Sequence, residues 1–194
     1  MRKALATLLI ITFMCIIGGW INPQKTDFSL INYLETHEVT TYEEFIEIIE
    51  QHSPKSVNEE KESLDDIAYF HIDIDYEDRV VSVVTMGEAS YDRSQGASNS
   101  ASKKYYNDLG VLIFTITVSG SFKYSSGTCT ATSNGGSYTK PFYSTWSSTP
   151  VFSKGNISTS KAYARTRGTA TSGSNTKTYS LTLTCDDSGN FSSY

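Results

Sequence analysis

The second half of this chain has almost none of the side chains that move protons in enzymes. No His follows His71, no Glu follows Glu88, and all but three of the 21 acidic residues precede Gly96. A Ser or Thr nucleophile needs a base, usually His or a positioned carboxylate. We therefore expect no catalytic residue in residues 96–194 and no enzyme activity.

The three acidic residues of that half also make a poor glycosidase pair. Asp108 stands beside a turn, and Asp186 and Asp187 are adjacent in a Ser-Gly-Asn turn context. Neighbouring strand residues point to opposite faces, whereas glycoside cleavage needs two carboxyl groups about 5–10 Å apart across a cleft. A secreted hydrolase is accordingly the least favoured function, although a site that spans both halves stays open.

The N-terminus predicts export. Met1-Arg2-Lys3 is followed by an apolar run from Ala4 to Ile17, which is typical of a signal peptide over residues 1–20. The alternative is an uncleaved membrane anchor, for which the run is short. Either way we expect a secreted, extracellular protein that touches a membrane only through this leader.

Cysteine is scarce, and its spacing excludes a CxxC redox or zinc motif. Of three cysteines, Cys15 lies in the leader, which leaves Cys129 and Cys185. Two cysteines in an exported chain predict one disulfide, which would stabilise the fold by about 2–4 kcal/mol. Two buried free thiols are the alternative.

Residues 21–95 are acidic and predict a helix followed by a β-hairpin. Apolar residues recur at helical spacing within residues 27–51, and Thr41 with Glu44 forms a capping box. Residues 69–76 alternate between apolar and polar, and an apolar strand follows at 80–84. The Ser-, Ala- and Gly-rich stretch from Tyr91 to Lys103 has no periodicity, so we place a domain boundary there.

Residues 96–194 predict an antiparallel β-sandwich. The clearest strand runs from Val111 to Tyr124, and further Ser- and Thr-rich strands cover residues 158–170 and 178–185. Gly-rich turns separate them. The predicted fold class is mainly β: a disulfide-bonded sandwich preceded by a small acidic helix-plus-hairpin segment that is a possible pro-region.

The alternating acidic strand is the best candidate for a metal site, but its geometry is unfavourable. His71, Asp73, Asp75 and Glu77 share one strand face. Side chains two residues apart on a strand lie about 6.6–7 Å from each other, too far to close around one ion. We expect a solvated face, and neither a metal nor another cofactor.

Two surfaces of the second half are candidates for binding. An irregular aromatic loop, residues 138–152, offers Tyr143, Trp146 and Phe152 as anchors, since such rings stack on sugars and anchor protein interfaces. Covering a small core is an equally good interpretation of this loop.

The second candidate surface is basic. On the strand at residues 158–170, Lys161, Arg165 and Arg167 share one face. They suit an anionic partner, and the acidic segment of the same chain is favoured over nucleic acid, which we do not expect as a partner.

Three stretches resemble small exported Ser/Thr-rich β-sandwich proteins of Gram-positive bacteria. They are Ser102–Gly110, Ser119–Tyr124 and Leu183–Asn190. The resemblance covers about the last hundred residues and implies export and the sandwich fold, but no activity and no functional residue.

The leading hypothesis is therefore an exported, non-catalytic protein that binds a cell-surface glycan or protein. The alternative is an antimicrobial or pore-forming effector that the acidic segment inhibits until cleavage near Arg93. Long strands that alternate apolar residues with Ser and Thr, such as residues 111–133, suit a membrane hairpin as well as a sandwich.

Overall fold

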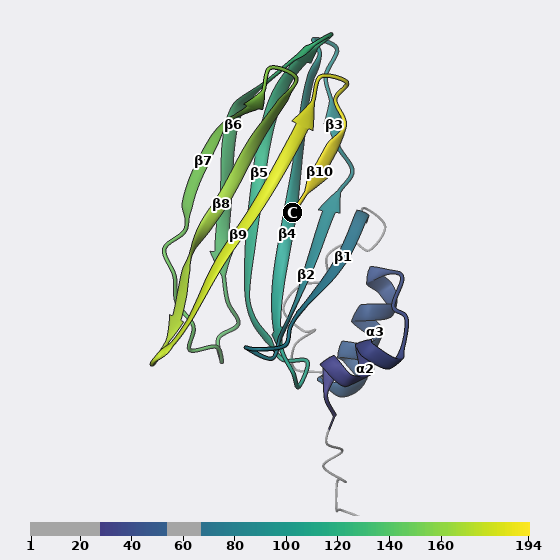
Figure 1. The fold of residues 1–194 in the computed structure, drawn as a ribbon, viewed down its shortest axis with the longest axis vertical. Helices are drawn as coiled ribbons and strands as arrows, with labels where there is room; N and C mark the ends of the chain where they lie inside the picture. Colours follow the sequence, from purple (N-terminus) through teal and green to yellow (C-terminus); the bar gives the residue numbers. More distant parts are fainter. Residues whose placement is uncertain (1–27, 54–66) are drawn as a thin grey trace, which may run out of the picture.

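The chain forms two antiparallel β-sheets and a helical layer (Figure 1). The computed structural model describes residues 28–53 and 67–194, so the predicted leader lies outside the described residues. The six-stranded sheet has the order β1-β2-β4-β5-β6, with β3 paired to β4, and the four-stranded sheet has the order β10-β9-β8-β7. The strands are β1 (Ile67–Asp75), β2 (Val80–Gly87), β3 (Ser90–Tyr91), β4 (Gly96–Asn107), β5 (Leu112–Ser125), β6 (Thr128–Thr139), β7 (Val151–Ser158), β8 (Lys161–Ser172), β9 (Asn175–Asp186) and β10 (Phe191–Ser193). The mainly β prediction is confirmed.

The acidic segment forms two helices, α2 (Leu30–Thr36) and α3 (Tyr42–His52), where the sequence predicted one. The break at residues 37–41 includes the β-branched run Val39-Thr40-Thr41, which disfavours helix. The predicted capping box is confirmed: the Glu44 amide donates to Thr41 Oγ1 at 3.2 Å, and the Glu44 carboxylate accepts from the Thr41 amide. These bonds satisfy amides that the first turn of α3 would otherwise leave unpaired.

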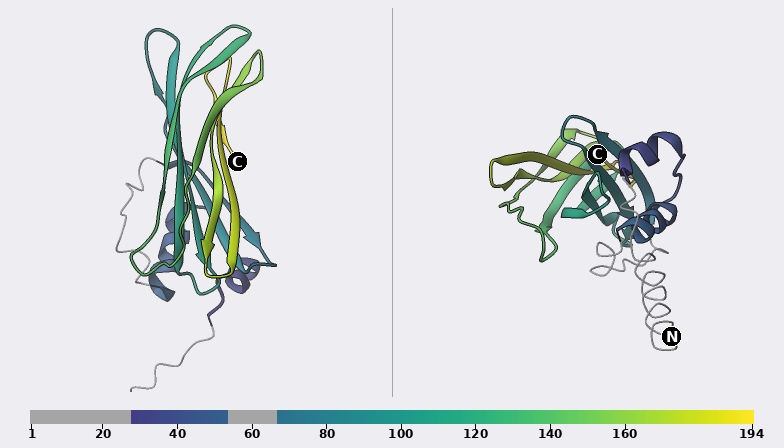
Figure 2. Two further views of the ribbon diagram at one scale, coloured as in Figure 1. Left: turned by 90° about the vertical axis from the view of Figure 1, so that its left-hand side faces the viewer. Right: turned by 90° about the horizontal axis from the view of Figure 1, so that it is seen from below.

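The helices pack against one face of the six-stranded sheet, over β1, β2 and β4 (Figures 1 and 2). Phe45 of α3 is fully buried, and its ring meets Tyr106 of β4 edge-on at 5.3 Å. Val81 and Val83 of β2 lie beneath the same layer. The apolar alternation of the acidic strand thus faces the helices, and its carboxylates lie on the opposite face.

The other face of the six-stranded sheet packs on the four-stranded sheet. Val84 and Met86 of β2 join Phe114 of β5 and Leu181 and Leu183 of β9 in one core. The layers approach closely because small residues face each other. A Cβ added to Gly120 of β5 would lie 2.8 Å from the Cβ of Ala164 in β8, closer than real methyl groups approach.

The aperiodic stretch from residue 96 to residue 103 is the first part of β4, a twelve-residue strand between β2 and β5. The predicted boundary between residues 95 and 96 thus falls at the turn between β3 and β4, inside one continuous sheet. The predicted strand from Val111 to Tyr124 corresponds to β5. Its first residue, Leu112, lies in the helix-facing core because a bulge interrupts the β4–β5 register between Tyr105 and Tyr106.

The predicted disulfide is absent from the structure: Cys129 and Cys185 are free, buried thiols. They lie 3.9 Å apart, one on β6 and one on β9, so each sheet contributes one cysteine. The sequence correctly predicted that the two cysteines lie together. Their covalent state is the alternative one, two buried free thiols.

The helices of the described segments are short. Neither α2 nor α3 has the length and apolar content needed to cross a bilayer.

Candidate functional site

A cavity of about 580 Å³ is lined by residues of the β1–β2 turn and of the β8–β9 turn. Both turns lie at the same end of the sandwich, the lower end in Figure 1. We call this cavity the terminal cavity. Its wall combines aromatic, aliphatic, charged and hydroxyl-bearing groups from five separate parts of the chain, namely Glu77, Asp78, Val80, Tyr105, Ile113, Phe114, Trp146, Ser174, Asn175, Thr176 and Lys177.

Aromatic rings form the apolar wall of the terminal cavity. The Phe114 ring lies 4.4 Å from the Tyr105 ring and 5.9 Å from the half-buried Trp146 ring, measured between centroids. The loop that carries Trp146 is tied to β8, since Ser147 and Thr171 exchange two backbone hydrogen bonds of 2.9 Å. Burial raises the pKa of Tyr105 well above its usual range, so its hydroxyl stays neutral and apolar contacts dominate here.

An ion-pair cluster forms the charged wall. The Lys177 ammonium donates to the carboxylates of Asp75 and, at 2.7 Å, of Asp78. Burial alone would lower the pKa of Lys177, but its hydrogen bonds to the two carboxylates raise it above its usual value. The hydrogen bond from Lys177 lowers the pKa of Asp75. Lys177 and Asp75 are therefore charged at neutral pH, and the hydrogen bonds from Lys177 to Asp75 and Asp78 join the β1–β2 turn to β9.

A second hollow, of about 460 Å³, shares Val80, Tyr105 and Lys177 with the terminal cavity. Here Asp73 lies 3.6 Å from the Lys103 ammonium and 3.0 Å from His71 Nε2. The acidic strand thus uses its carboxylates in pairs with lysines. Within residues 28–53 and 67–194, no three metal-ligating side chains converge.

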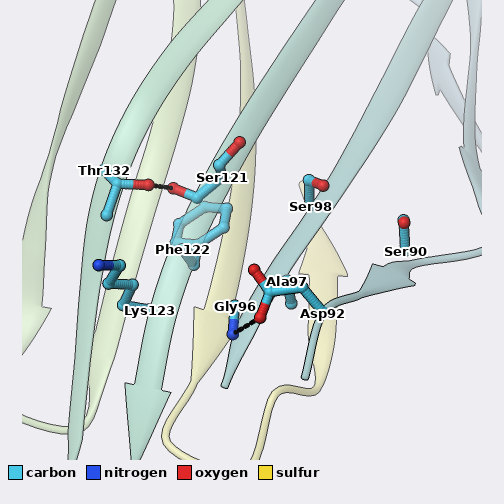
Figure 3. Close-up of a pocket in the computed structure, with 9 residues that line it drawn as sticks. All are labelled: Ser90, Asp92, Gly96, Ala97, Ser98, Ser121, Phe122, Lys123 and Thr132. Carbon is cyan, nitrogen blue, oxygen red and sulfur yellow. Dashed lines mark hydrogen bonds between the residues drawn. The ribbon is translucent and has the colours of Figure 1, made fainter. Parts of the chain in front are cut away.

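A smaller hollow, of about 160 Å³, lies at the other end of the sandwich beside β3 (Figure 3). Its carboxylate, Asp92, accepts hydrogen bonds from the backbone amides of Ser94 and Gly96, both at 2.8 Å, and from the Ser94 hydroxyl. These bonds lower the pKa of Asp92. Because the carboxylate already holds its own turn together, this hollow is a weaker candidate than the terminal cavity.

The three predicted aromatic anchors have different surroundings. Trp146 lines the terminal cavity, Tyr143 is half-buried in the same loop, and Phe152 is 39% exposed on the edge strand β7. Phe142, which the sequence did not single out, is 91% exposed and packs edge-on against Tyr143. Of the predicted trio, only Trp146 is placed in a cavity wall.

The predicted basic residues lie on the outer face of the four-stranded sheet, along β8. Within the described part of the chain, no salt bridge reaches Lys161, Arg165 or Arg167. The acidic segment instead forms ion pairs with Lys103 and Lys177, and Arg79 pairs with Asp108.

Of the polar residues of the terminal cavity, the sequence singled out Glu77 as a candidate metal ligand, but it did not indicate Asp78 or Lys177. Asp78 and Lys177 are 99 residues apart, and no local pattern links them. For the other polar residues, the sequence offered only Asn175, in a turn rich in Ser and Gly. Asn is common in such turns, so its presence there does not indicate a binding site. The cavity spans the acidic and the basic halves of the chain, so neither half reveals it alone.

No family model, curated protein or solved structure matches the chain. Function is therefore inferred from the site itself.

Proposed function

We propose that this is an exported, non-catalytic binding protein whose terminal cavity receives part of a cell-surface glycan. The observation that carries the proposal is the composition of the cavity wall, in which Trp146 lines the same cavity as carboxylate, amide and hydroxyl groups. An aromatic ring packs on the apolar face of a sugar, while polar groups bind its hydroxyls. A volume of about 580 Å³ lies within the usual range for ligand pockets.

The arrangement of acids supports binding over glycoside cleavage. The two carboxylates of the cavity, Glu77 and Asp78, come from one turn, and Asp78 is paired with Lys177. A glycosidase needs two carboxyl groups that flank the scissile bond. The other acids are used in turns: Asp186 accepts from the Ser188 amide at 2.9 Å, and Asp187 accepts from the Gly127 amide at 3.0 Å.

The pore-forming alternative has less support. It requires residues 21–95 to leave the sandwich, yet β2 contributes Val84 and Met86 to the sandwich core. Removal of this segment would expose apolar surface on both faces of β4. Such exposure costs about 25 cal/mol per Å² of apolar surface, which opposes the release of this segment.

Tryptophan fluorescence tests the glycan proposal directly. The chain has two tryptophans, Trp20 and Trp146, so a Trp20→Phe background makes Trp146 the only reporter. We expect neutral cell-wall oligosaccharides to shift its emission with saturation. By calorimetry, Trp146→Ala should weaken binding more than about tenfold, as loss of an anchoring aromatic does.

Phe152→Ala is the matched control, because Phe152 is an exposed aromatic that does not line the cavity. It should leave affinity unchanged. The proposal fails if no oligosaccharide shifts the emission, or if Trp146→Ala binds as tightly as the parent.

We also propose that, once the chain is exported, the two thiols exchange with a disulfide oxidant, which is reduced to two thiols, to form a disulfide that joins the two sheets. Burial raises the pKa of Cys185 to about 12 and also raises that of Cys129. The folded protein therefore holds little thiolate at neutral pH, and oxidation should occur during folding. Refolding with oxidised glutathione should give a mass two hydrogens below the reduced value, with two equivalents of reduced glutathione formed. An unchanged mass would refute it.

A further inference from the structure

The outer face of the four-stranded sheet carries a row of cations. On β8, Lys161, Tyr163, Arg165 and Arg167 occupy alternate positions, while the intervening Ala162, Ala164 and Thr166 are buried against the other sheet. None of the outward residues lines the terminal cavity. This face is therefore separate from the glycan site proposed above, and the inference does not depend on that site.

Arg165 is held in a defined position on this face. Its Nε donates to Thr182 Oγ1 at 2.9 Å, and its guanidinium carbon lies 4.9 Å from the centre of the Tyr163 ring. The ring itself lies against Gly155, where an added Cβ would come within 3.0 Å of a ring carbon. The guanidinium of Arg165 is thus already ordered, so it would lose little conformational entropy when a ligand binds. Within the sheet only its Nε donor is used, which leaves its other donors for a ligand.

Hydroxyl groups flank the two arginines. Across the ladder, Arg165 lies between Ser153 of β7 and Thr182 of β9, and Arg167 lies opposite Ser180. Each strand position is about 6.6–7 Å from the next one on the same face. Thr182 is only 1% exposed and serves to hold Arg165. The face therefore offers two guanidinium forks, with the Ser153 hydroxyl beside Arg165 and the Ser180 hydroxyl beside Arg167.

Among residues 28–53 and 67–194, no salt bridge reaches Arg165 or Arg167. In register, the nearest carboxylate is Asp186, opposite Lys161 at the end of β8. Asp186 accepts hydrogen bonds from the Ser188 and Asn190 amides, both at 2.9 Å. Burial acts to raise the pKa of Asp186, but these bonds keep it below its usual value, so the carboxylate stays in its own turn.

We propose that this face binds a linear polyphosphodiester that carries no bases. Tetrahedral phosphates have enough oxygens to accept from a guanidinium fork and from a neighbouring hydroxyl together, and repeated phosphates match a repeated row of cations. Contacts with the bases of a nucleic acid would use free aromatic faces or an element that enters a groove. Tyr163, the aromatic residue of this row, is already packed between Arg165 and Gly155.

Binding of fluorescently labelled poly(glycerol phosphate) at several salt concentrations tests the proposal on the full chain. Arg165→Gln with Arg167→Gln should weaken binding about tenfold or more. It should also lower the slope of log affinity against log salt by about 1.4. The matched control, Arg93→Gln with Lys123→Gln, removes the same charge from exposed positions elsewhere and should keep both the parent affinity and slope.

Two further measurements keep the outcome decisive. Arg165→Lys keeps the charge but removes the fork, and it should weaken binding while the thermal midpoint, measured by circular dichroism, shows the fold intact. Equal losses in the control pair and the β8 pair would overturn the proposal. So would tighter binding to single-stranded DNA of equal phosphate number, which would assign the face to nucleic acid.

Discussion

Cleavage after Arg93 should not release a folded sandwich. Arg93 lies in the exposed turn between β3 and β4, so a site-specific protease sequence inserted there is accessible. The cut would separate residues 67–93, which include β1 and β2, from the rest of the sheet. Both strands pair along their length with neighbours in that sheet, β2 with β4 from Val80 to Met86.

The magnitude follows from the buried side chains of β2. Val81, Val83, Val84 and Met86 are all less than 10% exposed, on alternate faces of the sheet. Each such side chain contributes about 1.5–3 kcal/mol, so their loss costs roughly 6–12 kcal/mol. A domain of this size is stable by only about 5–15 kcal/mol, so residues 96–194 alone should not fold.

Size-exclusion chromatography and circular dichroism measure this outcome. After the cut, the two pieces should elute together in native buffer and separate only in denaturant. Purified residues 96–194 should show no cooperative thermal transition, whereas the uncut protein with the same insertion should show one. The reasoning is refuted if residues 96–194 elute as a monomer that unfolds cooperatively.

The remaining predictions concern stability. Because Lys177 lowers the pKa of Asp75, their ion pair stabilises the fold above the usual aspartate pKa, and this stabilisation is lost as the pH falls below about 4. Lys177→Met should therefore flatten the acid part of a plot of thermal midpoint against pH. An unchanged slope in that part of the plot would contradict this prediction. Gly120→Ala should lower the free energy of unfolding by about 1–3 kcal/mol through overpacking, and adding Ala164→Gly should recover part of that loss. Urea denaturation of the parent, the two single variants and the double variant measures this. If the two single effects simply add, the close approach of the sheets at these residues is refuted. Thr41→Ala should cost about 0.5–2 kcal/mol through loss of the α3 cap, and an unchanged denaturation midpoint would mean that the cap is not formed.

Local patterns predicted five of the ten strands, namely β1, β2, β5, β8 and β9. Alternation placed Phe114, Ile116 and Val118 on one face of β5, and the structure buries all three. The capping box likewise marked the start of α3. Such signals work because one turn or one strand face is a short-range property of the chain.

Long-range pairing explains what the sequence did not reveal. The first half of β4 is rich in Ser, Ala, Gly and Asn, and it forms a strand because β5 pairs with it on one side and the short strand β3 pairs with it on the other. Tertiary contacts here override a weak intrinsic preference. The terminal cavity has the same origin, since the Asp75 carboxylate and the Lys177 ammonium meet across 102 residues.

The ion pairs of Lys177 also bear on self-association. β10 pairs with β9 only from Leu183 to Cys185, and the adjoining backbone bonds end at Thr182. Within the described chain, residues 175–181 of β9 therefore have no partner strand on the side opposite β8. An open strand edge of this kind is a template for pairing with another molecule. Lys177 lies on the inward face of this edge, and its ammonium is ion-paired with Asp75 and Asp78. Pairing with a second molecule there would disturb these ion pairs, so it is unfavourable. Replacing Lys177 with an apolar residue should therefore increase aggregation through this edge, which is the effect expected when a gatekeeper residue is lost.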